Sequence, residues 1–183
     1  SGKPAQLAFR ISLSAPDVER VRIYLDEQLR GEFSADGCDV AGSLDVEDPI
    51  LWDMAHPHLY RFRVELEADG RVEDEYSLPV GVRTIAIGGQ QLLLNGRPVF
   101  LNGFGKHEDF MIHGKGLHTP LMIKDYNLLR WIGANSFRTS HYPYSEEMLD
   151  LADRLGVLVI GESALVGLMR RNFSPASLEK CKA

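Results

Sequence analysis

The segment between Leu121 and Leu155 constrains the fold of this chain more than any other stretch. Apolar residues spaced three and four apart predict helices at Leu121–Ile132 and Ser145–Leu155. Between them, Ser136–Thr139 is too short for a helix and fits a buried strand. Open α/β sheets and (β/α) barrels carry their functional side chains at the carboxyl ends of such strands. We therefore expect the polar residues that follow this strand to line a site.

The same alternation of strand and helix extends to both sides of this segment. Val157–Ile160 is fully apolar, as is typical of a strand covered on both faces, and Val99–Leu101 is expected to form an earlier strand. Thr119 and Ser145 are expected to cap the two helices. These elements predict three β/α units with a parallel sheet, as found in open α/β sheets and in TIM (β/α)8 barrels. A barrel would be incomplete here, because its eight units need about 250 residues.

The first half of the chain alternates apolar and polar residues with a period of two, which predicts half-buried strands. The apolar positions of the clearest segments are Leu7, Phe9, Ile11 and Leu13; Val21, Ile23 and Leu25; and Tyr60, Phe62, Val64 and Leu66. The residues expected to face water in the last segment are Arg61, Arg63, Glu65 and Glu67. Ala68-Asp69-Gly70 predicts a hairpin turn, because Asp and Gly tolerate positive φ. Short strands at this spacing predict an immunoglobulin-like β-sandwich.

The predicted organisation is an α+β multi-domain chain with three regions. The sandwich is expected at residues 1–96 and the start of the barrel at residues 97–169. A hairpin at residues 84–94 and a tight turn at Asn95-Gly96 are expected to join them. Trp52 and Trp131 are predicted to be core residues. Residues 170–183 lack a clear period and are expected to be disordered.

Composition excludes several classes of function for the 183 residues. A formal net charge of −6 argues against a nucleic-acid partner. The two cysteines, Cys38 and Cys181, provide neither a disulfide framework nor a Cys-x-x-Cys metal site. No apolar run approaches the length of a membrane span, and no signal-peptide core is visible at the N-terminus. We therefore expect no membrane partner and, for a bacterial protein, a cytoplasmic location.

The central segment also carries a resemblance. Asn135-x-Phe137-Arg138-x-x-His141-Tyr142-Pro143, followed by Asp153-x-x-Gly156, is similar to the signature of family-two glycoside hydrolases. Within that family the surrounding sequence is most similar to that of β-glucuronidases. The segments that carry this similarity are Leu78–Arg83, Leu94–Pro98, Gly105–Asp109, Gly114–Gly116 and Arg138–Tyr144. The resemblance extends from Trp52 to Gly167.

The resemblance implies a sandwich followed by a catalytic barrel that hydrolyses β-glucuronides by double displacement. This chemistry uses two carboxyl groups and no cofactor or metal. The acid/base glutamate of the family follows an asparagine, and no Asn-Glu pair occurs in this sequence. We therefore expect no catalytic residue here and both glutamates beyond residue 183. The resemblance leaves open a β-galactoside as substrate, and a non-catalytic carbohydrate-binding or interaction module derived from such an enzyme.

Polar residues follow each of the three predicted barrel strands and are expected to form part of the wall of a carbohydrate pocket. The candidate substrate-binding residues are His107, Asp109, Arg138, His141 and Glu162. Arg138 offers a permanent cation with a bidentate fork, and His141 offers a donor and an acceptor near neutral pH. Many family members have Asp-Glu after the third strand, where this chain has Gly161-Glu162.

Other interpretations of these residues remain open from the sequence. Arg138 fits equally well as a structural ion-pair partner of Glu162 or Asp109. His141 fits a buried histidine that holds the following turn, and Asp109 with Glu162 fits an acid/base pair. A metal cluster would draw on His107, Asp109, His113 and His118. A barrel fragment also has unpaired sheet edges, which predict self-association.

Overall fold

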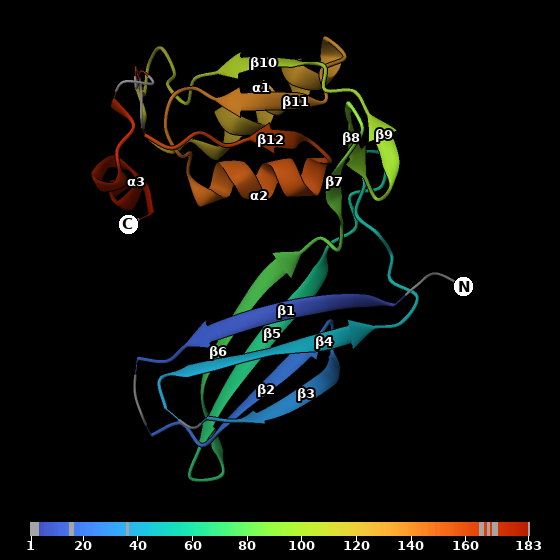
Figure 1. Cartoon of the computed structure of the whole chain (residues 1–183), viewed down its shortest axis with the longest axis vertical. Coiled ribbons are helices and arrows are strands. Elements are labelled where there is room, and N and C mark those ends of the chain that lie inside the picture. Colours follow the sequence, from blue (N-terminus) through green and yellow to red (C-terminus); the bar gives the residue numbers. More distant parts are fainter. Residues whose placement is uncertain are drawn as a thin grey trace. The chain divides into compact units, whose positions relative to one another are not determined.

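The computed structural model describes residues 4–14, 17–35, 37–164, 167, 169 and 172–182. Its internal contacts divide the chain into two compact units (Figure 1). The first contains the chain up to Asp53, His58–Ile85 and Leu94–Gly96. The second contains Met54–Pro57, Ala86–Leu93 and the residues from Arg97 onwards. The expected boundary near residue 97 falls where the chain enters the second unit for the last time.

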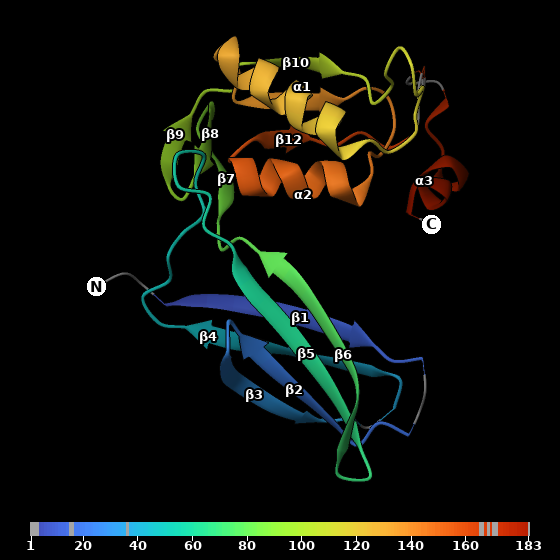
Figure 2. The same ribbon diagram turned by 180° about the vertical axis from the view of Figure 1, so that it is seen from behind.

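The first unit is an antiparallel β-sandwich, which confirms the prediction. Its strands are β1 (Ala5–Ser12), β2 (Arg20–Leu25), β3 (Gln28–Ser34), β4 (Asp39–Val46), β5 (Tyr60–Ala68) and β6 (Arg71–Val80). One sheet pairs β1 with β4, and the other has the order β3-β2-β5-β6 (Figure 2). Asp69 and Gly70 connect β5 to β6 with φ values of 50° and 69°, as expected for a tight hairpin turn.

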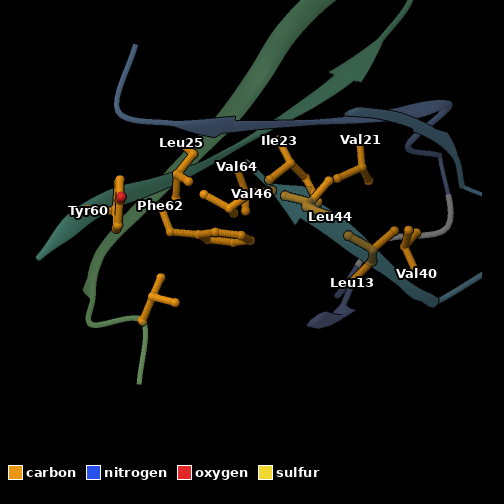
Figure 3. Packing of buried hydrophobic residues seen from close by; sticks show 11 residues of the cluster. Leu13, Val21, Ile23, Leu25, Val40, Leu44, Val46, Tyr60, Phe62 and Val64 are labelled. Carbon is orange, nitrogen blue, oxygen red and sulfur yellow. The ribbon is translucent and has the colours of Figure 1, made fainter. Parts of the chain in front are cut away.

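The core of the sandwich contains apolar positions that the period-two pattern identified in β2 and β5, together with residues of β4 that it did not (Figure 3). Val21 and Ile23 of β2 are fully buried, and they pack with Leu44 and Val46 of β4 in one cluster. Burial of each such side chain contributes about 1.5–3 kcal/mol. Trp52 is also fully buried, which confirms that prediction.

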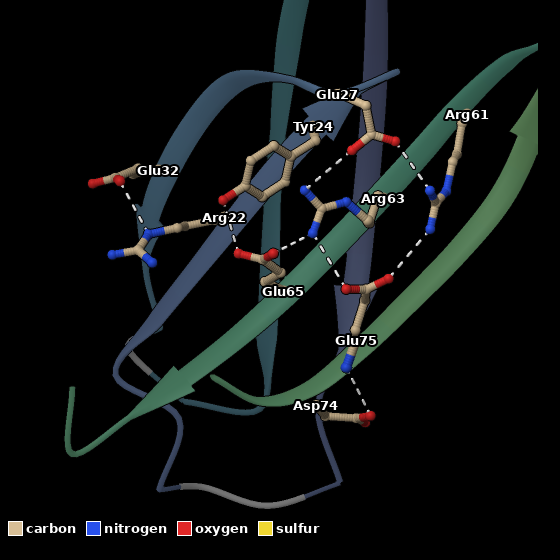
Figure 4. Close-up of polar contacts among 9 residues, drawn as sticks. All are labelled: Arg22, Tyr24, Glu27, Glu32, Arg61, Arg63, Glu65, Asp74 and Glu75. Carbon is tan, nitrogen blue, oxygen red and sulfur yellow. Dashed lines mark hydrogen bonds and ion pairs between the residues drawn. The ribbon is translucent and has the colours of Figure 1, made fainter. Parts of the chain in front are cut away.

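The polar face of β5 differs from our expectation, because its charged residues are not all open to water. Glu67 is 8% exposed and pairs with Arg22 at 2.7 Å. The side chains of Arg63 and Glu65 are only 12% and 14% exposed. They contact each other, the Tyr24 hydroxyl donates to Glu65 at 2.8 Å, and Arg63 lies 3.8 Å over the Tyr24 ring (Figure 4). Cross-strand partners that the sequence does not reveal therefore cover these charges.

Three short strands follow the sandwich. β7 (Ile85–Gly88), β8 (Gln91–Leu94) and β9 (Arg97–Val99) form a sheet in that order. The prediction of a strand at Val99–Leu101 is wrong, because the turn at Asn95-Gly96 lets β9 begin at Arg97.

The second unit contains a parallel sheet with the order β10-β11-β12. Its strands are β10 (Gly103–Lys106), β11 (Ser136–Thr139) and β12 (Leu158–Ile160), and its helices are α1 (Thr119–Trp131) and α2 (Glu146–Leu155). Buried residues of α1, α2 and β11 form one core, among them Tyr126, Phe137 and Met148. The arrangement confirms the start of a TIM barrel, with β10 as its first strand in place of the predicted Val99–Leu101.

Of the four predictions that concern the helix ends, three are confirmed and one is wrong. Ser145 caps α2 by accepting a hydrogen bond from the Met148 backbone N–H at 3.4 Å, and Gly156 ends α2 with a φ of 70°. α1 contains proline in its first turn, as expected. Its cap is His118, whose Nδ1 accepts from the Leu121 N–H, so the assignment of Thr119 as the cap is wrong.

Two predictions about exposure and order differ from the structure. Trp131 is 82% exposed and belongs to an apolar groove of about 370 Å³ along α1 and β10, so it is not a core residue. Leu128 of α1 and Ile132 at its end also line this groove and are 47% and 57% exposed. The tail contains helix α3 (Pro175–Lys182), where we expected disorder, and the Ser174 hydroxyl accepts from the Ser177 N–H at 3.1 Å. None of the described helices is long and apolar enough to cross a membrane.

Candidate functional site

The carboxyl ends of β10, β11 and β12 lie at one edge of the sheet, because the three strands are parallel and in register. Lys106, the last residue of β10, is opposite Thr139 of β11, and Arg138 is opposite Ile160 of β12. The five candidate residues therefore come from this edge: His107 and Asp109 after β10, Arg138 and His141 at the end of β11, and Glu162 after β12.

Glu162 is the centre of the most closely packed group at this edge. Its Oε1 accepts a short hydrogen bond from Arg138 Nη1, and its Oε2 lies 3.2 Å from Nδ1 of His141. The Glu162 backbone N–H donates to Oγ1 of the buried Thr139 at 2.8 Å. The hydrogen bond from Arg138 is the main cause of a lowered pKa for the Glu162 carboxyl. Glu162 is thus an ionised carboxylate held from both its side chain and its backbone.

The group remains open to solvent on one side. The side chains of Arg138, His141 and Glu162 are 40%, 43% and 26% exposed. The ring of His107 stands edge-on to that of His141, with 5.7 Å between the centroids. Asp109 joins less closely, since its carboxylate is 4.0 Å from Nδ1 of His107. The arrangement offers imidazole nitrogens and an ion pair whose charges compensate each other to a polar, uncharged group such as a hydroxyl.

Two other polar residues after β10 have structural contacts. Lys106 is 8% exposed, and its ammonium group pairs with Asp125 of α1 at 2.8 Å. Glu108 accepts a hydrogen bond from the Ser145 backbone N–H at 3.0 Å, beside the start of α2. These contacts explain why a polar run along the chain contributes only part of its residues to the site.

The structure bears on two of the interpretations that the sequence left open, the ion pair of Arg138 and the metal cluster. Arg138 pairs with Glu162, so the ion-pair interpretation holds for that partner. In the described ranges, no three His, Cys, Asp or Glu side chains come close enough together to hold a metal ion. His113 and His118, which the metal interpretation would need, stack on each other with 4.5 Å between their centroids.

Three residues near the site were not among the candidate substrate-binding residues. Thr139 anchors Glu162, as described above. Lys115, in the loop between β10 and α1, lies 4.0 Å over the ring of Tyr142 and so ties this loop to the residue after His141. The Tyr142 hydroxyl is buried and has no hydrogen-bond partner in the part of the chain that the structure describes. Thr139 and Tyr142 neighbour Arg138 and His141 in the sequence, but the contacts of all three residues join segments that lie far apart in the sequence.

Comparison with known proteins defines the class to which this fold and site belong. The model of glycosyl hydrolases family 2 matches residues 1–83, and the model of the family's TIM barrel domain matches residues 85–180. The chain belongs to glycosyl hydrolase family 2. The two models meet at residue 84, whereas we expected the domain boundary between residues 96 and 97.

Relatives of this chain within the family include β-glucuronidases. The chain is 46% identical over 175 residues to the enzyme of Paenibacillus borealis, covering 94% of this chain and 29% of that protein. It is 45% identical to the β-glucuronidase of Canis lupus familiaris, over 93% of this chain and 28% of the relative. The solved β-glucuronidase of Bifidobacterium dentium, complexed with coumarin-3-O-glucuronide, superposes with a TM-score of 0.85 at 35% identity. That match covers 97% of this chain and 30% of the relative, so the chain spans less than a third of the proteins it resembles.

Proposed function

We propose that this chain is part of a retaining β-glucuronidase, which hydrolyses β-D-glucuronides by double displacement. The observation that carries the proposal is the 46% identity to a β-glucuronidase over 94% of the chain, which extends through the site. The chain provides one wall of the sugar pocket. In this wall His107, Asp109 and His141 contact sugar hydroxyl groups, and Arg138 with Glu162 supports them.

Under this proposal, the residues of this wall do not catalyse the reaction by themselves. Double displacement needs a nucleophile and an acid/base carboxyl about 5 Å apart, and an acid that works near neutral pH needs a raised pKa. The pKa of the Glu162 carboxyl is lowered by its ion pair with Arg138, so Glu162 is unsuited to donate a proton. We propose that both catalytic carboxylates come from other parts of the whole protein.

The test compares the 183-residue chain with the whole protein that contains it. With a chromogenic β-glucuronide, we expect turnover by the whole protein and none by the chain. Replacement His141→Ala in the whole protein should raise KM, whereas Lys124→Ala on the exposed surface of α1 should not. Preference of the whole protein for a β-galactoside would contradict the assigned substrate. A whole protein that binds glucuronic acid but shows no turnover would favour the non-catalytic carbohydrate-binding module.

A further inference from the structure

The position of Glu162 determines which nitrogen of His141 can carry a proton. Glu162 Oε2 lies 3.2 Å from His141 Nδ1, and Glu162 itself is fixed by Arg138 and by Thr139. A carboxylate oxygen can only accept a hydrogen bond. The contact with His141 is therefore favourable only when Nδ1 carries the proton.

A second neighbour competes for the same nitrogen. Nη1 of Arg138 is 3.4 Å from His141 Nδ1 and could donate to it if Nδ1 were unprotonated. This distance is longer than the one to Glu162, and the same Arg138 nitrogen already donates to Glu162 Oε1. Nη1 carries a second N–H, but at 3.4 Å its contact with Nδ1 is weaker than the 3.2 Å contact with the Glu162 carboxylate. The balance of contacts favours the proton on Nδ1.

We infer that Glu162 is a positioning residue that holds neutral His141 as the Nδ1–H tautomer and leaves Nε2 as a hydrogen-bond acceptor. This inference rests on the proposed function only for the identity of the ligand. An accepting nitrogen binds a hydroxyl group, which can donate, and does not bind a carboxylate, which cannot. A glucuronide therefore presents one of its hydroxyl groups to His141, and its carboxylate group faces another part of the pocket.

Nitrogen-15 NMR of the histidine rings in the 183-residue chain tests the tautomer directly, at a pH where the rings are neutral. The His141 signals are assigned by their loss in His141→Gln. We expect Nδ1 in the range of a protonated nitrogen and Nε2 in the range of an unprotonated one. In Glu162→Ala the acceptor is gone and Arg138 is free to donate to Nδ1. We therefore expect Nε2 in the range of a protonated nitrogen and Nδ1 in the range of an unprotonated one. The matched control is Asp109→Ala, which removes a carboxylate beside the other histidine of the cluster and should leave His141 unchanged.

Two results would overturn the tautomer assignment: an Nε2–H ring in the unaltered chain, or an unchanged ring in a folded Glu162→Ala variant. If Glu162→Ala does not fold, the spectrum of the unaltered chain still decides. Titration of the whole protein with D-glucuronic acid should move the Nε2 signal of His141. Binding of the sugar without this movement would overturn the hydroxyl assignment alone. The proposed function fails separately, when the whole protein does not hydrolyse a β-glucuronide.

Discussion

Truncation of Phe62 in the sandwich core should lower the stability of the first unit by about 3 kcal/mol. Loss of a buried phenylalanine side chain costs about 3–5 kcal/mol, made up of lost burial and the cavity that remains. Phe62 is 8% exposed, and its ring lies 6.5 Å from that of Phe9. It also borders an open cavity of about 340 Å³ between β1 and β6. Since water can reach the emptied space, we expect Phe62→Ala at the lower end of this range.

Urea unfolding followed by tryptophan fluorescence measures the effect. Trp52 is fully buried in the first unit, and Trp131 is 82% exposed in the second. In a Trp131→Phe background, the emission of Trp52 therefore reports the sandwich alone. A loss of 3 kcal/mol corresponds to about a hundredfold change in the unfolding equilibrium constant, and to a midpoint lower by about 1–3 M urea.

Tyr76→Ala is the matched control, because Tyr76 borders the same cavity but is 65% exposed. Loss of its cross-strand contacts should cost less than about 1 kcal/mol. Equal midpoints for Phe62→Ala and Tyr76→Ala would refute the assignment of Phe62 to the core.

Three further predictions concern the second unit. Gly156→Ala should weaken its hydrogen-exchange protection, because φ is 70° and an added Cβ would lie 2.3 Å from the Met54 carbonyl oxygen. The lowered pKa of Glu162 means that its contribution to stability is complete above the ordinary carboxyl value of 4.5 and is lost as the pH falls through the lowered value. The unfolding temperature of Glu162→Gln should therefore fall less over this acidic range than that of the unaltered chain. The exposed apolar groove and the free edges of β10 and β12 should cause self-association at high concentration, which Trp131→Lys should reduce in sedimentation velocity.

Each of these predictions has an outcome that contradicts it. Unchanged exchange in Gly156→Ala would mean that the end of α2 can relax away from Met54. An acid transition that is the same with and without Glu162 would show that the ion pair of Glu162 does not contribute to the stability of the second unit. A monodisperse monomer with β12 amides as protected as those of β5 would show that the second unit needs no partner.

The sequence by itself determined the features that depend on near neighbours along the chain. The alternation around Phe62 identified one face of β5, and Ser145 and Gly156 identified both ends of α2. The turn at Asp69 and Gly70 followed from tolerance of positive φ. These signals are local, because backbone conformation and side-chain period are set within a few residues. The alternation of strand and helix then implied a parallel sheet with the candidate residues after its strands, although the first strand is β10 and not the predicted Val99–Leu101.

Tertiary structure alone decided which of these residues contact one another. Glu162 is 24 residues from Arg138 and 21 from His141 in sequence, and no local pattern specifies that pairing. The burial of Glu67 depends on arginines of another strand and on a bulge in β5, and the exposure of Trp131 depends on which face of α1 is covered. Contacts between distant segments depend on how the strands and helices pack, since a side chain of given chemistry accepts many partners. The sequence thus indicated where the site lies, and packing determined its hydrogen bonds and charges.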